Sequence, residues 1–261
     1  MLDLGRTFLQ SVERSPDAIA AVEGDTRLTY AAWLEQILRV AQGLDELGLE
    51  HGDHLLVVLQ NRLEMATLHW ACQFLGVIVT PLNWRAKPEE IDYCLIDAAA
   101  KAIVYEEVSA EAVAQSAEAP NVPRIVVGAD AQATHAYAGL LAAEPWTAGP
   151  RATADDISLM LYTSGTTGKP KGVPRRHRQE RAAALGHVAQ NQYGIGECTL
   201  GVMPLYHTMG VRSLLAMALV DGCFVCLPRF SPAAALALIQ RERVSNLYLV
   251  PTLYHDLLAH A

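Results

Sequence analysis

The chain has 261 residues, of which 51% are hydrophobic, and its formal net charge is −8 at neutral pH. This length and composition allow a large core, organised as one large or two smaller globular domains. The acidic balance excludes a global attraction to nucleic acid or to an anionic membrane. The most apolar stretch, residues 213–228, is interrupted by Asp221 and Gly222 and is shorter than the roughly 20 residues that cross a bilayer.

The cysteines lie at positions 72, 94, 198, 223 and 226, an odd number with no secretory leader before them. We therefore expect reduced thiols in a cytoplasmic protein. The interval between Cys223 and Cys226 is that of some metal or redox pairs. No second Cys or His pair accompanies it, and its neighbours are apolar and strand-like, so core packing is the favoured interpretation.

Helical and extended patterns alternate along the chain. The apolar spacing of residues 30–47 predicts a helix that ends at Gly48, where glycine allows a left-handed residue. Asn61 and Glu64 resemble a capping box that opens a helix ending near Gly76. The other predicted helices are 88–96, 110–118, 179–192, 232–241 and 252–259, and the predicted strands are 55–59, 77–80, 102–105, 124–127, 159–163, 223–227 and 247–250.

Short buried strands joined by helices predict an α/β fold of layered, mostly parallel sheets flanked by helices. Residues 128–155 are rich in Ala, Gly, Pro and Thr, and we interpret them as the main connection. The predicted organisation is therefore a first α/β subdomain at 1–150 and the start of a second one at 151–261.

Residues 162–172 read Tyr-Thr-Ser-Gly-Thr-Thr-Gly-Lys-Pro-Lys-Gly and directly follow a predicted strand. Glycine lets backbone N–H groups turn toward one point, hydroxyl groups add donors, and lysine adds positive charge. The string indicates a phosphate-binding loop, although the same residue types also dominate ordinary surface turns. Its spacing fits neither the nucleotide P-loop nor the dinucleotide Gly-x-Gly-x-x-Gly pattern.

Basic residues follow this loop where a helix is expected to begin, namely Arg175, Arg176, His177, Arg178 and Arg181. Cations at a helix N-terminus oppose its dipole, at a cost of up to about 1 kcal/mol each, unless an anion binds nearby. This placement favours a polyphosphate neighbour, and a solvated basic helix face stays open as the alternative. No aromatic residues are interleaved here, so a nucleic-acid site is disfavoured.

The loop resembles the signature loop of the adenylate-forming, or AMP-binding, superfamily, which includes acyl-CoA synthetases, luciferases and peptide-synthetase adenylation domains. The resemblance spans nearly the whole chain. Further segments that are similar to family motifs are Leu28-Thr29-Tyr30, residues 75–83, Gly172-Val173 with His177, residues 203–210 and Val250-Pro251-Thr252. Arg176 departs from the pattern, because Ser or Thr is usual at its position.

The resemblance implies an acid-CoA ligase of fatty or aromatic acid metabolism that uses ATP and Mg²⁺. It activates a carboxylic acid to an acyl-adenylate, releases pyrophosphate, and transfers the acyl group to coenzyme A. By their positions in the motif, the residues implied to bind ATP are Thr163, Ser164, Gly165, Thr166, Thr167, Gly168, Lys169 and Lys171. Thr163 is also implied to lie near Mg²⁺, and the implied catalytic residues are Thr163, Lys171 and His207. Such contacts stabilise the charge that develops on departing pyrophosphate.

The residues implied to bind the acyl substrate are Tyr206, His207, Met209 and Gly210. A lone histidine in an apolar neighbourhood is often a core residue, and that alternative stays open for His207. Relatives that select amino acids place an Asp near this position to pair with the substrate ammonium, so a histidine favours an acid without an α-amino group. Trp70, Tyr206 and Met209 suit aryl, alicyclic or medium-chain acyl groups equally.

Other sites receive less support. No Gly-x-Ser-x-Gly elbow is present, so the sequence does not favour a serine hydrolase. Arg229 is implied by family analogy to meet the coenzyme A phosphates, with surface solvation as the alternative. The sequence does not predict the oligomeric state.

Several family motifs are missing from these 261 residues, among them Tyr-Gly-x-Thr-Glu and the ribose-binding Asp motif. We therefore expect an N-terminal portion of the family pattern, with the C-terminal domain and its lysine absent. The polypeptide alone is expected to have little or no ligase activity. The alternative is a noncatalytic module of this family that binds a nucleotide or an acyl ligand.

Overall fold

The computed structural model describes residues 3–163 and 170–260. The chain forms two compact units. The first unit is Met1–Arg6, Glu35–Leu59 and Thr67–Gln179, and the second is Thr7–Leu34, Gln60–Ala66 and Glu180–Ala261. The predicted subdomains, residues 1–150 and 151–261, do not coincide with these units. The division into those two subdomains stays a prediction.

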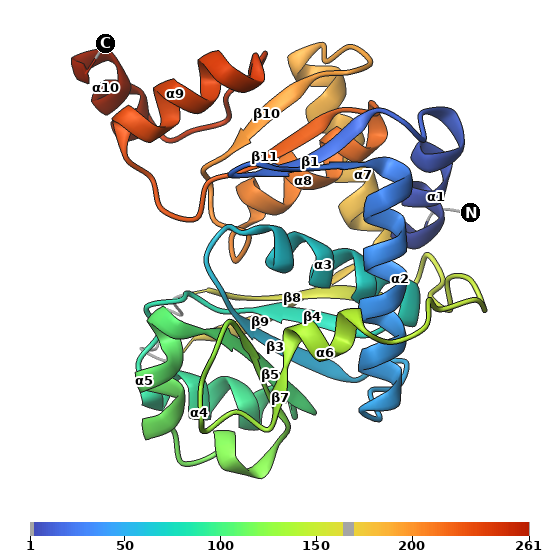
Figure 1. Ribbon diagram of the computed structural model, residues 1–261, viewed down its shortest axis with the longest axis vertical. Coiled ribbons are helices and arrows are strands. Elements are labelled where there is room, and N and C mark those ends of the chain that lie inside the picture. Colours follow the sequence, from blue (N-terminus) through green and yellow to red (C-terminus); the bar gives the residue numbers. More distant parts are fainter. Residues whose placement is uncertain (1–2, 164–169, 261) are drawn as a thin grey trace. The chain divides into compact units, whose positions relative to one another are not determined.

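The first unit contains a seven-stranded sheet in the order β7-β6-β5-β3-β4-β8-β9 (Figure 1). All neighbours in this sheet are parallel except β8 and β9, which are antiparallel. Its strands are β3 (His54–Val58), β4 (Ile78–Pro81), β5 (Ala102–Glu106), β6 (Arg124–Val127), β7 (His135–Ala136), β8 (Ile157–Thr163) and β9 (Lys171–Arg176).

The second unit contains a four-stranded sheet in the order β10-β11-β1-β2. Strand β11 is parallel to β10 on one side and to β1 on the other, and β1 and β2 form an antiparallel pair. These strands are β1 (Ile19–Glu23), β2 (Thr26–Thr29), β10 (Cys198–Gly201) and β11 (Cys223–Cys226).

Helices separate most of the strands along the chain (Figure 1). They are α1 (Leu4–Arg14), α2 (Tyr30–Glu46), α3 (Leu63–Leu75), α4 (Pro88–Asp97), α5 (Glu107–Gln115), α6 (Tyr137–Leu141), α7 (His177–Asn191), α8 (Thr208–Leu219), α9 (Pro232–Glu242) and α10 (Pro251–His260), with a 3₁₀ turn at Ala119–Asn121. Within the described residues, none of these helices has the length and apolar character needed to span a membrane.

The core of the first unit explains why its strands are readable from sequence. Strands β3 and β5 are buried along almost their whole length, and parallel strands covered on both faces are continuous apolar runs. Side chains of α4 and α5 pack on one face of these strands in a cluster that includes Leu56, Ile91 and Ile103. In the second unit, α9 and α10 bury apolar side chains with β10 and β11, including Leu200, Val225 and Leu257.

The predicted α/β class with mostly parallel sheets flanked by helices is confirmed. The predicted helices and strands between residues 30 and 127 are also present, although α5 begins and ends three residues earlier than expected. Gly48 has the predicted left-handed conformation, with φ of +85°.

Two local predictions are wrong. Residues 247–250 form no strand, and this region contributes only an isolated bridge between Thr199 and Asn246. Their apolar side chains pack into the core of the second unit without a strand partner. The apolar run in the sequence therefore indicates burial here and not a strand. Asn61 does not cap α3, because its side chain bonds the backbone of residues 201–205 instead.

Two histidines are buried in the first unit, His69 on α3 and His177 at the start of α7. His177 Nδ1 accepts a hydrogen bond from the Leu4 N–H at 3.1 Å, and the Nε2 atom of each histidine has no partner among the described residues. Burial, with repulsion from His177, lowers the pKa of His69 to about 3. Burial lowers the pKa of His177 to about 4, against the attraction of Asp3 and Asp156. Both rings are therefore neutral at pH 7.

Acidification from pH about 6.5 toward 4 is expected to lower the free energy of unfolding. In this window the unfolded chain binds protons at His69 and His177 that the folded chain does not, so stability falls as pH falls. A His69→Gln/His177→Gln variant should show a flatter pH dependence, by roughly 1.4 kcal/mol for each unit of pKa difference removed. Urea denaturation across this pH range measures the effect. His255→Gln, at a side chain that is 83% exposed, is the control, and equal slopes in wild type and double variant would contradict the prediction.

Candidate phosphate-loop and acyl-segment sites

The predicted phosphate loop is framed by two paired strands. Thr163, the last residue of β8, is directly opposite Lys171, the first residue of β9. The Thr163 hydroxyl points to the Lys171 carbonyl at a long 3.5 Å, and both residues are exposed. The structure therefore places the two ends of the loop side by side in the first unit, with the Thr163 hydroxyl available to a ligand.

Helix α4 anchors both ends of this loop. The Tyr162 hydroxyl donates to Asp97 Oδ2 at 2.8 Å, and the Tyr93 hydroxyl donates to the Pro170 carbonyl at 2.9 Å. The two tyrosine rings meet edge to face with centroids 6.2 Å apart. Burial and the hydrogen bond to Asp97 raise the pKa of Tyr162, which keeps its hydroxyl a donor. These anchors cannot be read from the sequence, because no local pattern links α4 to a loop about seventy residues later.

Six of the predicted ATP-binding residues lie outside the described residues. They are Ser164, Gly165, Thr166, Thr167, Gly168 and Lys169. Their predicted contacts with ATP remain predictions, as do those of Thr163 and Lys171.

The basic residues after the loop have protein partners. Arg175 and Arg176 lie on β9 and precede the helix. Arg176 donates to the Asp155 carbonyl, and Arg178 forms an exposed ion pair with the Asp155 carboxylate at 2.9 Å. In the second unit, Arg181 Nε donates to the Thr7 hydroxyl at 3.0 Å. These contacts give the arginines partners within the protein, whereas His177 of the same set is buried. The choice between a surface basic face and a polyphosphate neighbour stays a prediction.

The predicted acyl-binding residues surround the start of α8 in the second unit. His207 is the N-cap residue of this helix, with extended backbone angles and no capping bond from its side chain. Its ring is exposed and lies 4.9 Å from the Tyr206 ring, centroid to centroid. Within the described part of the chain this exposure does not support the core-residue alternative for His207. Tyr206 and Met209 are half-buried, whereas Gly210 is buried.

Asn61 holds the segment that leads to these residues. Its side-chain amide donates to the carbonyls of Gly201 and Met203 at 3.0 and 2.7 Å, and its oxygen accepts from the Leu205 N–H at 2.8 Å. Three bonds from one buried side chain fix an irregular backbone whose polar groups would otherwise lack partners.

Gly210 fits where a side chain would not. A Cβ atom added to this residue would lie 2.2 Å from the Pro204 carbonyl oxygen and 2.4 Å from that of Met203. The first turn of α8 thus packs directly on the backbone that Asn61 holds, and Gly210 supports the acyl segment through close packing.

The predicted site residues fall into two sets that belong to different units. Thr163 and Lys171 are in the first unit, and Tyr206, His207, Met209 and Gly210 are in the second. Among the described residues, no three His, Cys, Asp or Glu side chains gather in a way that could hold a metal ion.

Comparisons with known proteins agree with these features. The chain is 30% identical to feruloyl-CoA synthase from Amycolatopsis over 262 aligned positions, covering 98% of this chain and 50% of that protein. Its fold matches a fatty acyl CoA synthetase from Mycobacterium tuberculosis with a TM-score of 0.88 and 27% identity, covering 98% of this chain and 51% of that one.

A third similar protein is o-succinylbenzoate CoA synthetase from Bacillus subtilis, solved in complex with an acyl-adenylate intermediate. The TM-score is 0.84 at 25% identity, covering 98% of this chain and 64% of that one. The chain spans about half the length of the curated relatives it matches. The AMP-binding enzyme family matches residues 8–261, nearly the whole chain, and the protein belongs to this family.

Proposed function

We propose that these residues form part of an acid-CoA ligase that activates a carboxylic acid with ATP. The carboxylate attacks the α-phosphorus, the bond to pyrophosphate breaks, and an acyl-adenylate forms. The sulfur of coenzyme A then attacks the acyl carbon, and AMP leaves. The relatives named above are CoA ligases or synthetases, and the family match supports the adenylate chemistry.

The observation that carries this proposal is the frame of the phosphate loop. A loop rich in glycine, hydroxyl groups and lysine connects Thr163 to Lys171, which face each other across paired strands. Both ends are tied to α4 through Tyr93 and Tyr162. Because these ends are already fixed, binding of phosphate by the loop donors would not carry the entropy cost of ordering the ends.

Each member of the loop has a proposed task. Backbone N–H groups of 164–168 and the hydroxyls of Ser164, Thr166 and Thr167 bind the β- and γ-phosphates, together with Lys169 and Lys171. These contacts stabilise the negative charge that accumulates as pyrophosphate leaves. The exposed hydroxyl of Thr163 suits Mg²⁺, which prefers oxygen ligands and takes few of them from the protein. Mg²⁺ would neutralise charge on the departing phosphates.

The second unit is proposed to supply the acyl side. Tyr206, Met209 and Gly210 would line the acyl pocket, and His207 would flank the carboxylate. The exposed His207 ring can donate to a carboxylate and provides no anion for a substrate ammonium, which supports an acid without an α-amino group. The named relatives include aryl and fatty acyl ligases, so both substrate types belong in a screen.

The unpaired state of the cysteines supports the cytoplasm as the location.

Exchange of labelled pyrophosphate into ATP tests the adenylation step. The protein expressed from its complete reading frame is expected to catalyse exchange only when a suitable carboxylic acid is present, because the acid must attack ATP for the label to return. A panel of aryl, alicyclic and medium-chain acids, with an acid-free reaction as the control, measures this. Exchange that is independent of every acid would contradict the proposal.

The polypeptide of residues 1–261 alone is expected to show little or no exchange, because the family motifs that bind adenine and supply positive charge at the α-phosphate are not in it. Robust exchange by this polypeptide would refute that expectation. Nucleotide binding without exchange by the complete protein would favour the alternative, a noncatalytic binding module.

Asn61→Ala is expected to raise the KM for the acid and to lower kcat/KM by about tenfold. Its loss leaves three backbone groups of 201–205 unpaired, each at a cost of about 1 kcal/mol or more, and the acyl segment shifts. ATP affinity should change little, since the phosphate loop lies in the first unit. Steady-state kinetics with varied acid and varied ATP separate the two effects. Asn121→Ala, at an exposed asparagine, is the matched control, and an equal effect on both substrates would contradict this role.

A further inference from the structure

Cys198 and Cys223 are directly opposite each other on the neighbouring strands β10 and β11 of the second unit. This pairing was not visible in the sequence, where Cys223 and Cys226 are the close pair. Successive residues of a strand point to opposite faces, so Cys226, three positions on, faces away from Cys223. The two residues accordingly line different cavities.

The strand register pairs the two residues at a Cα separation that a disulfide can span. Paired residues on adjacent strands have Cα atoms about 4.8 Å apart, and disulfides form across Cα separations of about 4.4 to 6.8 Å. Both side chains of a directly paired position leave the sheet on the same face. The neighbouring Cys223 thiol lowers the pKa of Cys198, and Cys198 raises that of Cys223, which agrees with the pairing of the two residues in the strand register.

A cavity of about 360 Å³ gives reagents access to this pair. Cys198 and Cys223 contribute to its lining, with Arg27, Asp221, Glu242 and Arg243 at the same cavity. Cys198 is 9% exposed and Cys223 is half-buried, whereas Cys72 and Cys94 are fully buried and line none of the described cavities. Reactivity of a thiol requires access as well as ionisation, and the Cys198–Cys223 pair has a solvent cavity beside it.

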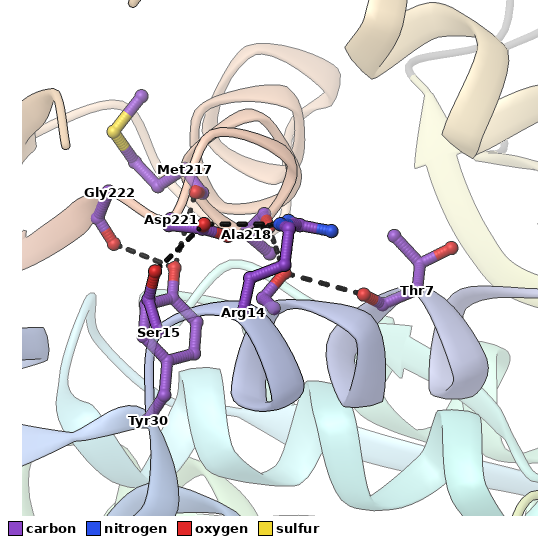
Figure 2. Close-up of polar contacts among 9 residues, drawn as sticks. Thr7, Arg14, Ser15, Tyr30, Met217, Ala218, Asp221 and Gly222 are labelled. Carbon is purple, nitrogen blue, oxygen red and sulfur yellow. Dashed lines mark hydrogen bonds and ion pairs between the residues drawn. The ribbon is translucent and has the colours of Figure 1, made fainter. Parts of the chain in front are cut away.

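Polar contacts hold the backbone that precedes Cys223 (Figure 2). Asp221 is 5% exposed and has a left-handed φ of +51°. Arg14 Nε donates to its carboxylate at 3.1 Å, and the Ser15 hydroxyl donates to it at 3.0 Å. The Tyr30 hydroxyl donates to the Gly222 carbonyl at 2.8 Å. These bonds fix the turn from which β11 begins, and hence the position of Cys223.

The backbone of Cys198 is also held by hydrogen bonds, in this case from Ser245. Its N–H donates to the Ser245 hydroxyl at 2.9 Å, and its carbonyl accepts from the Ser245 N–H at 2.9 Å. The Cys223 N–H donates to the Glu197 carbonyl at 2.7 Å. Because both backbones are anchored, the two residues stay paired across the strands and a disulfide requires little backbone movement.

The two thiols differ in acidity. Interaction with the Cys223 thiol lowers the pKa of Cys198, against burial and the repulsion of Glu242 and Glu197. Interaction with Cys198, together with burial, raises the pKa of Cys223. This difference supports Cys198 as the attacking thiol and Cys223 as the thiol that resolves the mixed disulfide.

We propose that Cys198 and Cys223 form a redox modification site that low-molecular-weight disulfides oxidise to a disulfide between β10 and β11. The Cys198 sulfur attacks the reagent, its S–S bond breaks, and one thiol leaves as a mixed disulfide forms. Cys223 loses its proton to solvent and attacks Cys198, which releases the second thiol. Two protein thiols are oxidised, and one reagent disulfide is reduced to two thiols. This site is independent of the proposed ligase chemistry.

Glutathione disulfide is the probe, applied to the folded protein in mildly alkaline buffer, followed by alkylation and tryptic mass mapping. Trypsin separates the pair, because Cys198 lies on residues 182–212 and Cys223 on residues 213–229. We expect these two peptides to become cross-linked and to separate again on reduction. Loss of the free Cys198 thiol should be at least about tenfold faster than loss of the Cys72 thiol, since Cys198 lines a solvent cavity and Cys72 is fully buried.

Serine variants assign the bond. Cys226→Ser should cross-link like wild type, Cys198→Ser should not cross-link, and Cys223→Ser should accumulate a glutathione adduct on Cys198. Because Cys223 and Cys226 share the peptide of residues 213–229, tandem fragmentation of the wild-type cross-link tells them apart and keeps the test decisive if a variant does not fold. A missing cross-link in wild type, modification of Cys198 no faster than Cys72, or a bond between Cys223 and Cys226 would each overturn the proposal.

Discussion

The antiparallel pairing of β8 and β9 is the constraint on which the proposed ATP site depends. It brings Thr163 and Lys171 opposite each other, although eight positions separate them in the sequence. The tyrosine contacts to α4 then fix the strand ends. The two ends of the loop are thus fixed before a ligand binds, so binding phosphate need not order these ends. The match to the AMP-binding enzyme family supports the proposal that this loop binds the phosphates of ATP.

The second unit depends on a different kind of constraint, in which buried polar side chains replace regular pairing. Asn61 forms hydrogen bonds with the irregular backbone of 201–205. Asp221 accepts hydrogen bonds from Arg14 and Ser15 at the turn before β11. Both ends of α8 are therefore adjacent to segments held by hydrogen bonds. The proposed acyl residues lie at one end of this helix and the proposed redox pair lies near the other.

The parts of this fold that are readable from sequence are those in which local pattern and burial agree. Strands β3 and β5 are apolar runs apart from His54 and Glu106 at their ends, and glycine at position 48 ends α2 through a left-handed residue. Helix α8 was not predicted, because it is buried on nearly all sides and its sequence therefore lacks an amphipathic period. The contacts of Asn61 and the pairing of Cys198 with Cys223 were not predicted for a related reason. In each case the two partners lie more than twenty residues apart in the sequence, and no local pattern encodes the contact. The phosphate loop was found by its composition, whereas its anchors were not.

Nucleotide titration calorimetry on the protein expressed from its complete reading frame tests the central claim most directly. The Thr166→Ala/Thr167→Ala/Lys171→Ala variant is compared with wild type and with Lys101→Ala, at an exposed lysine of the same unit. We predict that the triple variant loses at least about tenfold in affinity for ATP with Mg²⁺, and loses turnover, while AMP binding and the Lys101→Ala protein stay unchanged. Indistinguishable ATP affinity and turnover in the triple variant and wild type would contradict the assignment of this loop to phosphate binding.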